Sequence, residues 1–127
     1  MARVLLIEDN PANLELLRFI LEAFGHTTLC ASDGHAGLEL LRKEYPDLVL
    51  CDLRMPLLDG FGVLKAVRAD ERLRGMVMVA VTAYSMPGDR DDALKAGFDG
   101  YITKPITPQT IVREVEALLA RGRPDSS

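Results

Sequence analysis

Two hydrophobic patterns alternate along the whole chain. Short, unbroken apolar runs are followed by longer segments in which apolar residues recur every three or four positions. The short runs are typical of strands buried on both faces, and the longer period is typical of helices. The pattern predicts strands at residues 4–7, 27–30, 48–51, 76–81 and 101–103, and helices that begin near residues 11, 33, 61, 89 and 108.

Proline, glycine and capping residues set the expected ends of the helices. Pro11 begins the first helix and Gly25 ends it, and its apolar residues Leu14, Leu17, Leu21 and Phe24 should face the core. Ser32 or Asp33 caps the second helix, which Pro46 ends. Thr107 caps the last helix, with Pro108 in its first turn. The helix at residues 89–96 has only a thin apolar stripe, formed by Ala93, Leu94 and Ala96.

Regular alternation of strands and helices predicts an α/β fold with a doubly wound, five-stranded parallel sheet between two layers of helices. At 127 residues the chain has the size of one domain. We expect that domain to cover residues 1–120 and a disordered tail to cover residues 121–127. Ligands of such sheets bind at the carboxyl ends of the strands, so the residues that follow each strand are the candidates for function.

Composition and charge exclude several classes of protein. The chain is 48% hydrophobic and has a net charge of -4, which fits a globular domain and offers no basic surface for nucleic acid. Three neighbouring arginines, Arg68, Arg72 and Arg74, alternate with Asp70 and Glu71. We interpret them as a solvated helix end and loop rather than a phosphate-binding patch.

Cys30 and Cys51 both lie in apolar, strand-like stretches, so we expect two buried thiols and no disulfide framework. The apolar run at the N-terminus is too short for a signal peptide or a membrane span. A cytoplasmic location is therefore expected.

Polar residues follow four of the five predicted strands. Glu8 and Asp9 follow the first, Asp52 the third, Thr82 and Ala83 the fourth, and Lys104 and Pro105 the fifth. Taken singly, each of these is as well explained by a helix cap or a turn. Their joint position at one edge of the sheet favours a functional site.

The chemistry of these residues points to phosphoryl transfer. Clustered carboxylates repel one another, and a hard cation such as Mg²⁺, which prefers oxygen ligands, would remove that conflict. Lys104 offers a positive charge for a phosphate oxygen, Thr82 offers a hydroxyl, and the small Ala83 leaves room for an incoming group. Together they indicate transfer of a phosphoryl group to the carboxylate of Asp52.

Four motifs carry a resemblance to a known family: "LLIEDN", "PDLVLCDLRMPLLDG", "VAVTAY" and "GYITKP". Together, in this order and spacing, they resemble the receiver domain of two-component response regulators. The resemblance implies a flavodoxin-like fold with strand order 2-1-3-4-5. It also implies that Asp52 accepts a phosphoryl group from the phosphohistidine of a kinase.

The resemblance assigns further roles at the same edge. Asp9 would bind Mg²⁺ directly and Glu8 through water, with Asp52 and the backbone carbonyl of Arg54 as further ligands. Phosphoryl oxygens would contact Thr82, Ala83 and Lys104. The Lys104–Pro105 peptide would be cis. Gly60 would fit the turn after the loop that follows Asp52, which is called the acceptor loop below. Tyr101 would be the aromatic switch that turns inward when Thr82 moves.

The implied function is a signalling switch that catalyses only its own phosphorylation and slow dephosphorylation. Its implied partners are a histidine kinase or phosphotransfer protein and an output protein, or a second copy. The implied partner surface is the face formed by the helix at residues 89–96, the strand at 101–103 and the helix that begins near residue 108. No contact with nucleic acid or membrane is expected. The stretch "EDNPANLELL" resembles receivers of phosphorelays and hybrid kinases, including those of small cell-division regulators. Met1 and the loose tail after Leu119 favour a stand-alone domain over a piece of a larger regulator or hybrid kinase.

Two other families share parts of this pattern. A flavodoxin needs a phosphate-binding loop rich in Ser, Thr and Gly after the first strand, where this chain has the acidic "EDNPAN". A phosphatase of the haloacid-dehalogenase type needs a second Asp two residues after the first-strand nucleophile, and Pro11 stands there. Both are disfavoured.

Overall fold

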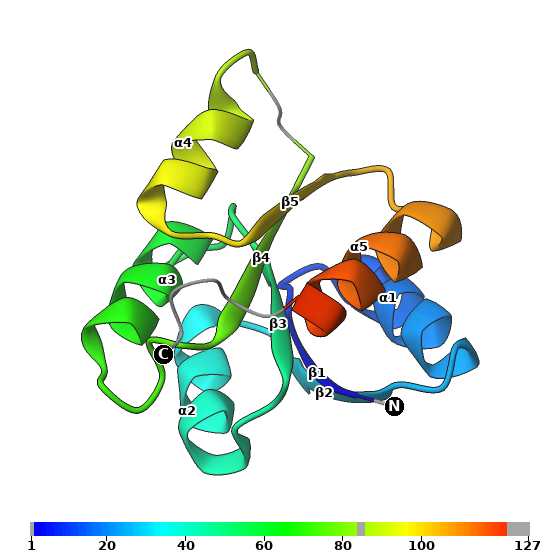
Figure 1. Cartoon of the computed structure of the whole chain (residues 1–127), viewed down its shortest axis with the longest axis horizontal. Helices are drawn as coiled ribbons and strands as arrows, with labels where there is room; N and C mark the ends of the chain where they lie inside the picture. Colours follow the sequence, from blue (N-terminus) through cyan, green and yellow to red (C-terminus); the bar gives the residue numbers. More distant parts are fainter. Residues whose placement is uncertain (1, 84–85, 122–127) are drawn as a thin grey trace.

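The computed structural model describes residues 2–83 and 86–121 (Figure 1). Strands and helices alternate along these residues, as the hydrophobic pattern predicted. The strands are β1 (Arg3–Ile7), β2 (Thr27–Ala31), β3 (Leu48–Asp52), β4 (Val77–Thr82) and β5 (Gly100–Thr103). The helices are α1 (Pro11–Ala23), α2 (Gly34–Glu44), α3 (Gly60–Ala69), α4 (Asp89–Ala96) and α5 (Pro108–Arg121).

All strands pair in parallel, in the order β2-β1-β3-β4-β5. This confirms the predicted fold. One core lies between the sheet and α1 and α5, with Leu17, Leu21, Ile111 and Val115 facing the strands. A second core lies on the opposite face, under α2, α3 and α4. The two layers of helices are visible on either side of the sheet in Figure 1.

The central strands explain why the site is rigid. Every residue of β3 and β4 is buried, because helices cover both faces of a parallel sheet. Asp52 is the last residue of β3 and Thr82 the last residue of β4. The buried strands therefore fix the backbone of both residues at the carboxyl edge.

Side chains cap four of the helices in the described part of the chain. Asn10 caps α1 by accepting hydrogen bonds from the backbone N–H groups of Ala12 and Asn13. Asp33, one of the two expected caps, precedes α2 and accepts a hydrogen bond from the N–H of Ala36. Asp59 precedes α3 and accepts one from the N–H of Gly62. Thr107 caps α5, as predicted, by accepting a hydrogen bond from the N–H of Thr110 at 3.4 Å. Such caps satisfy N–H groups that have no partner inside the helix.

Two expectations about burial are wrong. Phe24 is 55% exposed, because α1 ends at Ala23 and the backbone leaves the helical path at Phe24. Cys30 is exposed because β2 is an edge strand with polar surroundings on its outer side, whereas Cys51 in the central β3 is buried. Both thiols are free, so the expectation about disulfides holds for these two residues.

The expected solvated role of Arg68 is also wrong. Its guanidinium donates hydrogen bonds to backbone carbonyls of residues 74, 76 and 97 and pairs with Asp99. Arg72 and Arg74 are exposed, as expected.

The C-terminal helix α5 runs through Arg121, one residue into the segment expected to be a tail. The rest of that segment, residues 122–127, lies outside the described residues. Within the described part of the chain, none of the helices has the length and apolar character that a bilayer crossing requires.

Candidate functional site

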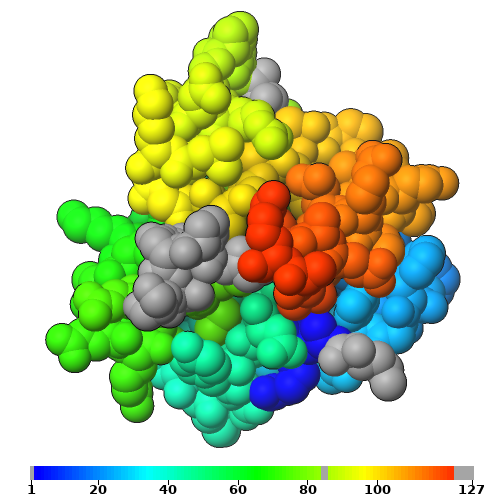
Figure 2. Space-filling model, in the orientation of Figure 1, coloured from blue at the N-terminus to red at the C-terminus, as the bar shows by residue number. Residues whose placement is uncertain are grey.

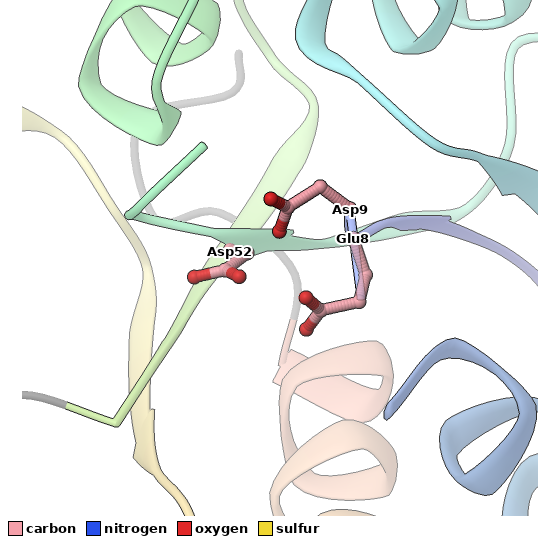
Figure 3. A group of neighbouring side chains, drawn as sticks. All are labelled: Glu8, Asp9 and Asp52. Atoms are coloured by element: carbon pink, nitrogen blue, oxygen red, sulfur yellow. The ribbon is translucent and has the colours of Figure 1, made fainter. Parts of the chain in front are cut away.

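A cavity of about 350 Å³ opens at the carboxyl edge of the sheet. Carboxylates from two different loops converge on it: Glu8 and Asp9 follow β1, and Asp52 ends β3 (Figure 3). One oxygen of each carboxylate lies within 4.8 Å of the others. The other residues that line the cavity are Asn10, Pro11, Asn13, Arg54, Ala83 and Lys104.

Asp52 is buried, and the backbone fixes its orientation. Its Oδ1 accepts a hydrogen bond from the N–H of Arg54 at 3.0 Å, and its Oδ2 lies 3.4 Å from Nζ of Lys104. Oδ1 is thus held by the loop that follows β3, and Oδ2 is directed toward the ammonium group of Lys104, which follows β5. This arrangement suits a positioned nucleophile.

Glu8 is the more deeply buried carboxylate, at 1% exposure. Its Oε2 accepts a hydrogen bond from the N–H of Asn10 at 3.2 Å. Its Oε1 lies 2.9 Å from Nζ of Lys104 as an ion pair, and it accepts no hydrogen bond from any described residue. Lys104 therefore bridges Glu8 and Asp52, a pairing that the sequence did not reveal.

The surroundings shift the protonation of this pair. Burial, together with the neighbouring Asp52 carboxylate, raises the pKa of Glu8 from its ordinary 4.5 to about 7. Burial alone would lower the pKa of Lys104, but its contacts with Glu8 and Asp52 raise it above the ordinary value. Lys104 therefore stays positively charged, whereas the ionised form of Glu8 is destabilised.

The donor set fits a magnesium ion. Three carboxylates offer hard oxygen ligands at one point, and the buried Glu8 Oε1 contacts the Lys104 ammonium at 2.9 Å. Lys104 neutralises only one of the three negative charges. A divalent cation would neutralise the remainder.

The predicted phosphoryl contacts divide between two cavities. Ala83 and Lys104 line the acidic cavity. Thr82 is fully buried and lines a neighbouring cavity of about 310 Å³, together with Leu53, Arg54, Asp59, Phe61, Asp89 and Asp92. In this structure Thr82 is thus next to the acidic cavity without lining it.

Tyr101 lies on β5, beside the strand that carries Thr82. Its backbone pairs with Ala80 of β4, and its side chain is 5% exposed and packs within the core under α2, α3 and α4. The ring is thus already in an inward position, whereas the resemblance implied a ring that turns inward when Thr82 moves. The Lys104–Pro105 peptide that follows β5 is cis, as expected.

Gly60 has a different role from the one expected. It is the first residue of α3 and does not require a positive φ, so turn geometry does not explain it. A Cβ at this position would lie 2.6 Å from the carbonyl oxygen of Asp52 and 2.8 Å from Cα of Leu53. Gly60 therefore permits the close approach of α3 to the acceptor loop.

Sequence reasoning missed Asn10 and Asn13, which both line the acidic cavity. Asn10 also caps α1, and its place directly after Glu8 and Asp9 was the available signal. Asn13 gave no signal, because only the helical turn after the cap brings it to the cavity.

Comparison with known proteins agrees with this geometry. Residues 4–116 match the family model described as the response regulator receiver domain. The chain belongs to the response-regulator receiver-domain family. This confirms the resemblance that the four motifs carried and makes the chain a receiver domain of two-component signalling.

Among curated proteins, this receiver domain is 36% identical to the polar-differentiation response regulator DivK of Brucella ovis, over 91% of this chain and 94% of that protein. Two solved structures give the same fold at a TM-score of 0.86. One is chemotaxis protein CheY4 of Vibrio cholerae, at 26% identity over 92% of this chain and 98% of that one. The other is the receiver domain of a Pseudomonas aeruginosa sensor histidine kinase, at 30% identity over 94% and 98%. That structure has a magnesium ion coordinated in its active-site cleft.

Proposed function

We propose that this receiver domain accepts a phosphoryl group on Asp52 and that its partner-binding surface changes as a result. The observation that carries the proposal is the position of the Asp52 carboxylate. It lies at the end of a fully buried strand, between an acidic cavity and the ammonium group of Lys104. The donor is a histidine kinase or a phosphotransfer protein, whose phosphohistidine would enter the cavity.

The chain's own residues would perform the transfer as follows. One oxygen of the Asp52 carboxylate attacks phosphorus, and the phosphorus–nitrogen bond of the phosphohistidine breaks. The phosphohistidine ring carries a proton on its other nitrogen when it reacts, so the products are an acyl phosphate and a neutral imidazole. Lys104 is placed to pair with a phosphoryl oxygen, and Ala83 leaves space for the group. Thr82, at the end of the neighbouring strand, would donate its hydroxyl to the phosphoryl group after moving toward the cavity.

Asp9, Asp52 and Glu8 would hold the Mg²⁺, with the Arg54 carbonyl as a further ligand. When bound, the ion supplies positive charge that offsets the charge of the incoming phosphoryl group. Only part of its coordination shell would come from the protein, as is usual for Mg²⁺. The domain has no other substrate in this proposal, and its chemistry is limited to its own phosphorylation and slow dephosphorylation.

The output surface in this proposal is the face formed by α4, β5 and α5. Figure 2 shows α4 in yellow and α5 in orange as neighbouring parts of one side of the molecule. Movement of Thr82 would be passed to the adjacent Tyr101 and so to this face, which would bind an output protein or a second copy. From the resemblance of "EDNPANLELL", we also propose a phosphorelay or cell-division role for a stand-alone domain. The similarity to DivK, a polar-differentiation response regulator, over 91% of this chain and 94% of that protein supports a regulator of this size. The cytoplasmic location and the domain limits at residues 1–120 also stay predictions.

The test is phosphorylation by acetyl phosphate with Mg²⁺, followed by measurement of intact mass. We expect a single phosphate adduct in the wild-type protein and none in Asp52→Asn. Asp59→Asn is a matched control, because Asp59 caps α3 in the same loop but lies outside the acidic cavity. An undiminished adduct in Asp52→Asn would overturn the proposal.

A further inference from the structure

The guanidinium group of Arg68 joins three separate segments. From its place near the end of α3 it donates hydrogen bonds to the carbonyls of Arg74 at 2.9 Å and Met76 at 2.7 Å, both in the loop before β4. It also donates two hydrogen bonds to the carbonyl of Gly97, at 2.7 and 3.3 Å, and pairs with Asp99 at 3.1 Å. One side chain thus fixes the end of α3, the entry to β4 and the link between α4 and β5.

This network is largely shielded from water. The side chains of Arg68 and Asp99 are 17% and 8% exposed. Asp99 Oδ2 also accepts a hydrogen bond from the N–H of Met78 at 2.8 Å, which ties the pair to β4. Hydrogen bonds between charged groups in such a setting are stronger than neutral ones, and their fork geometry is specific to arginine.

The two ends of α4 are held very differently. Within α4, Ala93 alone is buried, so the helix has little core of its own. Its start at Gly88 is in the left-handed conformation and has no side-chain cap among the described residues. Its end at Gly97 receives the Arg68 bonds, a favourable place for a cation because carbonyls at a helix C-terminus carry partial negative charge. Figure 1 shows the start of α4 projecting from the molecule and its end beside α3.

A separate contact links the start of α4 to β5, the strand that carries Tyr101. Arg90, in the first turn, lies with its Nη1 3.5 Å from the carbonyl of Tyr101 on β5. A displacement of Tyr101 therefore reaches α4 at its first turn. Asp99, two residues before Tyr101, is held by Arg68.

We propose that Arg68 is a positioning residue of the output switch. It fixes the C-terminal end of α4, so that the change produced by phosphorylation is confined to the N-terminal half of the helix. The helix moves about a fixed point at Gly97, and the partner surface changes mainly around residues 86–92. This inference rests on the proposed switch and adds where α4 moves and what holds it.

The experiment compares NMR spectra of the wild-type protein, Arg68→Lys and Arg72→Lys, each with Mg²⁺, before and after beryllofluoride. Arg72→Lys is the matched control, because Arg72 is an exposed arginine a few residues away. In the wild type and in the control we expect backbone shift changes at residues 86–92 that are at least about threefold larger than those at residues 95–99. In Arg68→Lys the charge remains but the fork is lost, so the changes should extend evenly through residues 95–99.

A second measurement needs no phosphate mimic. The amides of Gly97, Phe98 and Asp99 donate to carbonyls of Leu94, Ala93 and Met78, and they report directly on the anchored end. We expect hydrogen exchange at these amides to be at least about tenfold faster in Arg68→Lys and in Asp99→Asn, with little change in α1 and α2. This local pattern distinguishes loss of the anchor from general destabilisation.

Three results would count against the inference. Even shift changes along α4 in the wild type, with clear changes around Asp52 and Thr82, would overturn it and leave the proposed function standing. Unchanged exchange at residues 97–99 in Arg68→Lys would overturn it as well. Beryllofluoride shifts that are absent around Asp52 would overturn the proposed function and this inference together.

Discussion

At the scale of single residues, the site contains a charge conflict that either a proton on Glu8 or a bound divalent cation would relieve. Glu8 is buried beside Asp52, and Lys104 is shared between them. The sequence placed these groups at one edge, but it could not show that Lys104 approaches Glu8 more closely than Asp52. That preference depends on how deeply each side chain is buried, which is set by the packing of β1, β3 and β5.

The raised pKa of Glu8 predicts how stability depends on pH without metal. Between its ordinary pKa of 4.5 and its folded value of about 7, the folded protein binds more protons than the unfolded chain. The free energy of unfolding should therefore fall as pH rises through this window, by up to about 3 kcal/mol. Urea unfolding at pH 5 and pH 7 with a chelator measures this loss.

Glu8→Gln is the control for that prediction. It cannot ionise, so it should lose much less stability between pH 5 and pH 7. The same loss in wild-type and Glu8→Gln proteins would show that another group causes the pH dependence.

At the scale of elements, the contact between α3 and the end of β3 is the tightest constraint on the acceptor loop. Gly60→Ala would place a methyl group against the backbone of Asp52 and Leu53. We expect the free energy of unfolding to fall by roughly 1–3 kcal/mol and the phosphate adduct to form more slowly. Urea unfolding and the acetyl phosphate reaction measure the two effects.

Gly62→Ala is the matched change two residues further along α3. Its Cβ would meet the Cδ1 atom of Leu58, the end of a flexible side chain that can turn away, and alanine favours a helix. Its stability should stay within about 1 kcal/mol of the wild type. Equal losses in the two variants would mean that contact with the acceptor loop is not what Gly60 serves.

Element boundaries could be predicted from the sequence pattern and strand order from the family resemblance, and the failures share one cause. Hydrophobic period, prolines and caps are local signals, and they placed each element to within one or two residues. Phe24, Cys30 and Arg68 were misjudged because their surroundings come from distant segments. An edge strand exposes Cys30, and carbonyls of the α4–β5 link surround Arg68. Tyr101 also belongs here, since its inward position depends on packing across the sheet.

At the scale of the whole molecule, binding of Mg²⁺ should stabilise the fold by mass action. An ion that binds only the folded chain adds about 2.7 kcal/mol at a hundred times its dissociation constant. We expect excess Mg²⁺ at neutral pH to raise the thermal midpoint of the wild type and to have much less effect on Asp9→Asn.

Asp91→Asn controls for general charge, because Asp91 is an exposed carboxylate on α4. Its midpoint should rise with Mg²⁺ as in the wild type. If Asp9→Asn responds to Mg²⁺ as fully as Asp91→Asn, then Asp9 is merely a residue at the start of α1.

The strand order also affects when the site can first exist during protein synthesis. Glu8 and Asp52 are made early, but β3 pairs with β4 on one side, and Lys104 follows β5, the last strand. Pairings between distant strands form only when the later strand is available. A chain still emerging from the ribosome therefore exposes Asp52 without its neighbouring strand or its lysine. Under the proposed function, such a chain would not yet accept phosphate, and signalling would begin only with a nearly complete molecule.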